Sequence, residues 1–191
     1  MLGQLPTTLD ICGKRYDIRS DYRNILRIIT AYNDDGLTDG EKVYVCLKRL
    51  FVDFESIPNQ QYAQAYLAAT AFIECHTRED APAPKTVNWE KDEQLIFPAV
   101  NKVAGTEVRA LPYLHWWTFL GYYQSIDHDG LFGFVLTIRQ KKAKGKKLEK
   151  HEQEFYRSNT NLCRVEDKPA PQKVEDSMKS MFDSLPEEGD S

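Results

Sequence analysis

Apolar side chains recur along most of this chain at the spacing of α-helices. From Tyr22 to Ile29 they fall at positions i, i+3, i+4 and i+7, which is one face of a helix. Similar apolar stripes follow in four later segments, which are 43–54, 62–73, 96–103 and 131–138. The pattern therefore predicts a mainly α fold, a compact domain of several helices.

Residues at the ends of these stripes supply helix start and stop signals. Thr38 and Glu41 have the spacing of a capping box, and Asn88 is a candidate cap for the helix that follows it. Gly105 can end that helix, whereas Pro98 inside it predicts a kink or a later start. Pro112 is expected to open the next helix, which is rich in aromatic residues.

A different pattern precedes the helices, in residues 8–19. Apolar residues alternate with aspartates there, which predicts a short N-terminal β-hairpin. A two-residue turn at Gly13-Lys14 would place Ile11 opposite Tyr16 and Leu9 opposite Ile18. These four apolar side chains would then share one face, which must pack against another part of the protein, because an isolated hairpin is only marginally stable.

The composition predicts one helical domain over residues 1–165. Its helical layers are expected at about 20–76 and 88–163, joined by a polar, proline-containing linker at 77–87. Residues 166–191 carry eight acidic residues and three lysines and are expected to form a disordered acidic tail.

The net charge of −4 is unevenly distributed. Residues 139–150 hold seven cationic side chains against Glu149, whereas the C-terminal segment is strongly acidic. A solvated basic helix face, or an internal partner for the acidic tail, explains this run better than nucleic-acid binding does. The run lacks the interleaved aromatic residues on which bases stack.

No motif in the 191 residues indicates catalysis. The signatures of nucleotide-binding loops, zinc proteases and serine hydrolases do not occur, and the four cysteines are widely separated. Asp127-His128-Asp129 is better explained as a solvated turn between helices than as a general base or a metal site. We therefore expect no enzyme activity, cofactor or metal. The chain has no membrane-spanning apolar stretch, and its first residues do not look like a signal peptide.

Two adjacent tryptophans stand out in the aromatic helix. Trp116 and Trp117 point about 100° apart, so one helix face cannot bury both. Either two layers of protein enclose this helix, or one indole faces a partner. His115 is expected to be buried and hydrogen-bonded to Asp92 on the preceding helix, which gives both residues a structural role.

Several motifs between residues 89 and 139 resemble those of the bacteriophage Gp15 family of siphophage tail proteins from phages of Gram-positive bacteria. The chain lacks the tyrosine–glycine turn expected ahead of the tryptophan helix and has Val103-Ala104-Gly105 there. The motifs that carry the resemblance are Trp89-x-x-Asp92 with Ile96 and Ala99, Leu114-His115-Trp116-Trp117 with Phe119, and Ile138-Arg139.

The resemblance implies a tail assembly chaperone that acts in the host cytoplasm and is absent from the virion. Such a protein would bind the tape measure protein, and a second tail assembly chaperone is a further candidate partner. The resemblance does not lead us to expect nucleic acid as a partner, and it makes no prediction about self-association. Helix-in-groove binding would then involve Trp89, Trp116, Trp117, Phe119 and Tyr123.

Two alternatives remain open from the sequence. One is a structural virion component, such as a connector or tail completion protein. The other is a nucleic-acid-binding regulator that acts through Lys141–Lys150.

Overall fold

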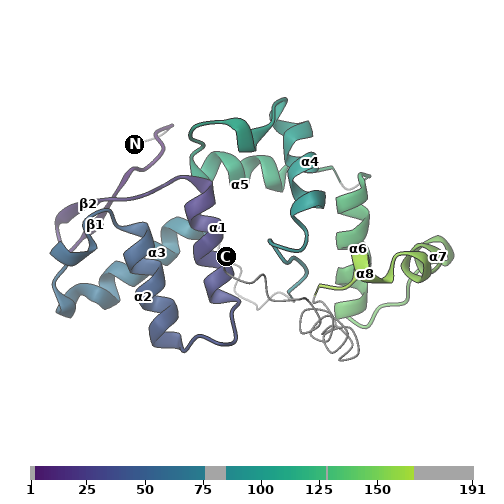
Figure 1. Ribbon diagram of the computed structural model, residues 1–191, viewed down its shortest axis with the longest axis horizontal. Helices are drawn as coiled ribbons and strands as arrows, with labels where there is room; N and C mark the ends of the chain where they lie inside the picture. Colours follow the sequence, from purple (N-terminus) through teal and green to yellow (C-terminus); the bar gives the residue numbers. More distant parts are fainter. Residues whose placement is uncertain (1–2, 76–84, 128, 166–191) are drawn as a thin grey trace, which may run out of the picture.

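The structure is a computed structural model that describes residues 3–75, 85–127 and 129–165. Within these residues it is mainly helical, with a two-stranded antiparallel sheet at the N-terminus, which confirms the predicted fold class (Figure 1). The strands are β1 (Thr8–Ile11) and β2 (Lys14–Asp17). The α-helices are α1 (Tyr22–Tyr32), α2 (Asp39–Leu50), α3 (Tyr62–Ile73), α4 (Glu93–Ala104), α5 (Trp116–Gln124), α6 (Leu131–Ala143), α7 (Lys150–Ser158) and α8 (Thr160–Cys163).

Short 3-10 turns complete the described part of the chain, at Phe54–Ser56, Asn59–Gln61 and Val108–Ala110. Most of the predicted linker at 77–87 lies outside the described residues. The same holds for the whole predicted tail at 166–191.

The molecule is elongated, with the hairpin and α1, α2 and α3 at one end, α5 and α4 in the middle, and α6, α7 and α8 at the other end (Figure 1). The hairpin packs on α3, and α2 contacts both α1 and α3. Helix α5 contacts both α1 and α4, and α4 in turn contacts α6, which carries α8. Helices α4 and α5 therefore join the N-terminal group of elements to the C-terminal group.

The hairpin forms, but its predicted register is wrong. Leu9 lies opposite Tyr16 and Ile11 lies opposite Lys14, a shift of two residues from the expected pairing. Because side chains alternate with a period of two, an even shift leaves the same residues on the inner face. Three side chains on that face, Ile11, Tyr16 and Ile18, are buried as expected.

The turn chemistry explains this register. The loop residues are Cys12 and Gly13, and both have positive φ angles of 52° and 84°. This combination is typical of a type I′ turn, whose twist matches that of the two strands. An Asp10 carboxylate oxygen accepts a hydrogen bond from the backbone N–H of Gly13 at 3.0 Å, which closes the turn.

Helix ends follow the sequence signals in part. Thr38 and Glu41 form the predicted capping box, with both reciprocal hydrogen bonds present. Gly105 ends α4 with a φ angle of 69°, a left-handed conformation that glycine adopts without strain.

The start of α4 differs from the expectation. The side-chain oxygen of Asn88 accepts hydrogen bonds from the backbone N–H groups of Glu90 and Lys91, at 3.2 and 3.1 Å. Asn88 therefore stabilises a turn ahead of the helix, and α4 begins at Glu93. Pro98 lies within the helix.

Helix α5 also begins later than Pro112. Its first residue is Trp116, because His115 is the N-cap and its ring accepts a hydrogen bond from the backbone N–H of Trp117. The preceding residues run in an extended path in which the backbone N–H of Leu114 donates to the Asp21 carboxylate at 3.1 Å. This contact holds the start of α5 against the start of α1.

Candidate functional site

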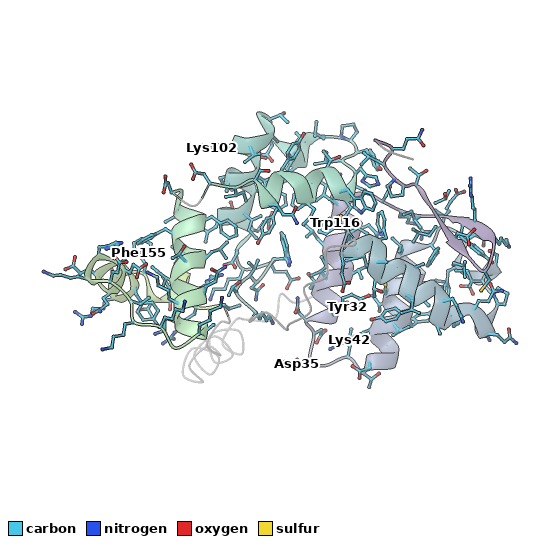
Figure 2. The ribbon with its side chains drawn as sticks, turned by 180° about the vertical axis from the view of Figure 1, so that it is seen from behind. Tyr32, Asp35, Lys42, Lys102, Trp116 and Phe155 are labelled. Carbon is cyan, nitrogen blue, oxygen red and sulfur yellow. The ribbon has the colours of Figure 1, made fainter. Side chains whose placement is uncertain are left out.

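The two adjacent tryptophans attach α5 to the end of α3. The indole N–H of Trp116 donates to the carbonyl of Ile73 at 2.8 Å, and that of Trp117 donates to the carbonyl of Phe72 at 2.9 Å. The last carbonyls of a helix lack the usual donor four residues later in the same helix, and the two indoles each supply a donor to one of these carbonyls of α3. Figure 2 shows Trp116 where α5 meets the N-terminal helices.

Phe119 lies in the core between three helices. Its ring stacks on Tyr22 of α1 at 4.4 Å, and the ring of Phe97 on α4 lies 6.0 Å away. Trp116, with 2% of its surface exposed, stacks on Phe119 from the other side. These two predicted partner-binding residues therefore contribute to the core.

The other three predicted partner-binding residues are only partly buried. Trp89 and Tyr123 have their rings 4.9 Å apart, and burial raises the pKa of Tyr123 to about 12. Trp117 lines a small apolar pocket of about 180 Å³ with Leu9 of the hairpin and Phe72 of α3. The five residues therefore do not form one continuous surface.

The predicted hydrogen bond between His115 and Asp92 is wrong. His115 is buried, but its Nε2 lies 2.9 Å from the carbonyl of Pro6, and its Nδ1 accepts from the backbone of Trp117. Because Nδ1 accepts, Nε2 is the ring nitrogen that donates to the Pro6 carbonyl. As the N-cap of α5, His115 faces the N-terminal segment instead of α4.

Asp92 instead forms a buried ion pair with Arg139 of α6. The Arg139 side chain is 1% exposed and the Asp92 side chain 2% exposed, and two hydrogen bonds of 2.5 and 2.8 Å join them. The Asp92 carboxylate also accepts from the backbone N–H of Asn88 at 2.9 Å. This pair is not apparent from the sequence, because Arg139 stands at the start of the basic run.

Arg139 also donates hydrogen bonds to backbone carbonyls of segments that come before and after it in the sequence. It donates to Thr86 at 2.9 Å, to Leu162 at 2.7 Å and to Arg164 at 3.0 Å. A guanidinium group has five donors in a fixed plane, which suits it to several acceptors at once. The ion pair therefore joins the segment before α4, helix α6 and the end of α8.

Two lysines of the basic run are also part of the folded structure. Lys141 forms an ion pair of 2.6 Å with Glu152, which is buried. Lys142 lies 4.0 Å from the ring centroid of Tyr156. The remaining lysines of the run are exposed, and they are Lys144, Lys146, Lys147 and Lys150.

An apolar groove lies beside α4, at the connection between α5 and α6. Its volume is about 340 Å³. Two of its apolar side chains are conspicuously exposed: Leu131 retains 54% of its surface and Val103 retains 37%. We call this feature the α4–α6 groove, and its lining consists of Gln94, Leu95, Pro98, Ala99, Lys102, Val103, Ser125, Ile126, Asp127, Gly130, Leu131 and Phe132.

Pro98 lines the groove and interrupts the hydrogen bonding of α4. Proline has no backbone N–H, so it cannot donate to the carbonyl of Gln94 one turn earlier in α4. Gln94 also lines the groove. Pro98 therefore leaves the carbonyl of Gln94 without its usual helical donor.

The residues that the structure describes contain no group of three or more His, Cys, Asp or Glu side chains able to hold a metal ion. In the turn at 125–130, the backbone N–H of Asp129 donates to the Asp127 carboxylate at 3.1 Å, as expected for a turn, and His128 lies outside the described residues. Among the described helices, none is long and apolar enough to span a membrane.

Comparison with known proteins agrees with the sequence motifs. A family model described as "Bacteriophage Gp15 protein" matches residues 1–163, from the N-terminus to the end of α8. Searches among curated proteins and among solved structures found no match. The family match covers most of the chain and includes the hairpin, the tryptophan helix and Arg139. The chain therefore belongs to the bacteriophage Gp15 family.

Proposed function

We propose that this phage protein is a tail assembly chaperone that binds the tape measure protein in the host cytoplasm and catalyses no reaction. The observation that carries this proposal is the α4–α6 groove, where Val103 and Leu131 keep apolar surface exposed at the rim. Exposed apolar surface that borders a groove is typical of protein-binding sites.

The groove suits an amphipathic helix. Apolar side chains at positions i, i+3 or i+4 and i+7 of a helix form a ridge that enters such a groove. A volume of about 340 Å³ accommodates a few of these side chains. The polar residues Gln94, Lys102 and Asp127 also line the groove and can bind polar groups that flank the ridge.

A long helical tape measure protein needs this kind of shelter. Its apolar faces would aggregate before the tail tube encloses them, because large exposed apolar patches associate in water. A chaperone with a net charge of −4 would keep the covered assembly in solution.

Co-expression tests this proposal. The tape measure protein is expected to be soluble when produced with the wild-type chain and insoluble alone. Val103→Glu/Leu131→Glu places two charges in the groove and should abolish the rescue. Leu67→Glu on α3 is the matched control, because Leu67 is 67% exposed but does not line the groove. Equal solubility of the tape measure protein with and without the chain would refute the chaperone role.

The groove variant also requires a check of its fold. Val103 and Leu131 are both exposed, so their replacement by glutamate should leave the circular dichroism spectrum and the melting temperature of the chain nearly unchanged. Loss of rescue without loss of the fold then reports on binding.

Purified virions distinguish the chaperone from a connector. Mass spectrometry of mature particles should find no copies of this chain if it leaves the tail after assembly. A fixed copy number in every particle would instead identify a structural component.

A further inference from the structure

Cationic side chains from three parts of the chain gather around a second pocket, at the end of the molecule that carries α6, α7 and α8. Lys85 comes from the segment before α4, Arg139 and Lys142 from α6, and Arg164 follows α8. The pocket has a volume of about 390 Å³, and none of the described residues that line it is acidic. We call it the basic pocket.

The folded chain compensates only part of this charge. Asp92 neutralises Arg139, yet the Arg139 Nε atom is buried and has no hydrogen-bond partner among the described residues. Lys142 contacts the face of Tyr156, and no described carboxylate forms an ion pair with Lys142 or Arg164. The exposed lysines at 144–150 extend the positive charge beyond the pocket. This surface therefore suits carboxylates.

The chain carries a complementary segment that starts beside the pocket. Val165 lines the pocket, and residues 166–191 follow it directly. Their sequence holds eight acidic residues and three lysines. These 26 residues span at most about 90 Å when extended, so each acidic position can reach the pocket.

We infer that carboxylates of residues 166–191 bind the basic pocket and the exposed lysines of 144–150 in the same chain. Covalent linkage gives the segment an effective concentration in the millimolar range, so individually weak ion pairs suffice. The same acidic segment would compete with nucleic acid for these lysines, and Tyr156 is the one aromatic side chain among the described residues that line the pocket.

Zero-length cross-linking of the full chain tests this inference. A carbodiimide joins lysine amines to carboxylates that form ion pairs, and mass spectrometry identifies the joined residues. The acids at 175–190 should couple to Lys142 and to the lysines at 144–150 at least about tenfold more than to Lys102. Lys102 is a matched control because it is exposed and lies on α4, at the other groove. The yield should fall at least about threefold at 500 mM salt, where the screening length is only about 4 Å.

A mixture of light and ¹⁵N-labelled chains separates binding within a chain from binding between chains. Links that join light peptides to light ones and heavy to heavy support the inference, and abundant mixed links would overturn it in favour of a second copy. Equal coupling to Lys102 would overturn it as well.

Charge-removing variants provide a second readout on the full chain. Lys142→Gln/Arg164→Gln should reduce the links to Lys144–Lys150 at least about threefold, since the pocket adds to the local potential. Arg27→Gln/Lys102→Gln removes two exposed cations elsewhere and should leave these links unchanged. A mobility-shift assay with a 30-base-pair DNA at 150 mM salt tests whether nucleic acid binds this surface instead. Tight binding that abolishes the links would overturn the inference and assign the surface to nucleic acid.

Discussion

The charge pair between Asp92 and Arg139 is almost completely removed from water, and it joins segments that are far apart in the sequence. Burying two charges costs several kcal/mol, which only good geometry and further hydrogen bonds offset. Arg139 has both, through Asp92 and three backbone carbonyls. Removal of either partner leaves the other charge buried without compensation.

Asp92→Ala should therefore lower the free energy of unfolding by about 3–5 kcal/mol. Glu93→Ala is the neighbouring control. Glu93 is half exposed and lies 3.7 Å from Arg109, so its loss should cost no more than about 0.5 kcal/mol. Urea titration followed by circular dichroism measures both values. Similar midpoints for the two variants would contradict the assignment.

The two indoles should differ in their contribution to stability. Trp116→Phe leaves the buried carbonyl of Ile73 without its donor and opens a small cavity, and it should cost about 2–3 kcal/mol. Trp117→Phe should cost about 1 kcal/mol or less, because Trp117 is partly exposed and the carbonyl of Phe72 also accepts from the backbone N–H of Cys75. Thermal unfolding of the two variants checks the order.

Burial raises the pKa of Cys46 to about 11, above the ordinary value of a thiol. The folded state then holds this proton to higher pH than the unfolded state does. Its contribution to stability is complete below about pH 8.5 and is lost as the pH rises towards 11. Denaturant titrations from pH 8 to 11 should show a steeper loss of stability for the wild type than for Cys46→Ala. Equal slopes would mean that Cys46 does not retain its proton in the folded state.

At the scale of single elements, local periodicity predicted the helices that bury a clear apolar stripe. Helices α1, α2 and α3 lie where the stripes are, since each covers the core with one face. Helices α7 and α8 lie inside the helical layer expected at 88–163, but no apolar stripe marked them individually, because few of their residues are apolar. Helix α7 is held instead by Phe155 against Phe134, at 5.0 Å, and by the ion pair of Glu152 with Lys141. Those partners lie on α6 and are invisible to a local pattern.

The hairpin turn was mispredicted for a related reason. Glycine alone suggested a turn at Gly13-Lys14, but Cys12 also adopts a positive φ angle. Such a conformation costs a non-glycine residue about 1 kcal/mol or more, so sequence preference argues against it. Packing of the inner face on α3 compensates for this cost.

Two glycine substitutions test these backbone arguments. Gly13→Ala should destabilise the chain by about 1 kcal/mol, since alanine is strained at a φ angle of 84°. Gly121→Ala should stabilise it by about 0.5–1 kcal/mol, because Gly121 lies inside α5 with open space around its position. Opposite shifts of the melting temperature are expected, and shifts of the same sign would contradict the geometry.

At the scale of the whole molecule, the exposed apolar groove lies beside α4 and not on the tryptophan helix, where the sequence suggested it. The sequence suggested that the tryptophan helix lines a binding groove, because this helix is apolar nearly all round. In the structure this helix joins the two ends of the molecule, and Trp116 and Phe119 are buried in its contacts with the neighbouring helices. The α4–α6 groove combines residues up to 38 positions apart, and its exposed members Val103 and Leu131 look like ordinary stripe residues in the sequence.

Site-specific photo-cross-linking tests the central claim most directly. A photoreactive phenylalanine analogue replaces Leu131 in the groove, or Leu67 on α3 as the control, and the chain is co-expressed with the tape measure protein. We predict cross-links to the tape measure protein from position 131 and few or none from position 67. Cross-links from position 67 with none from position 131 would contradict the claim that the α4–α6 groove is the binding site.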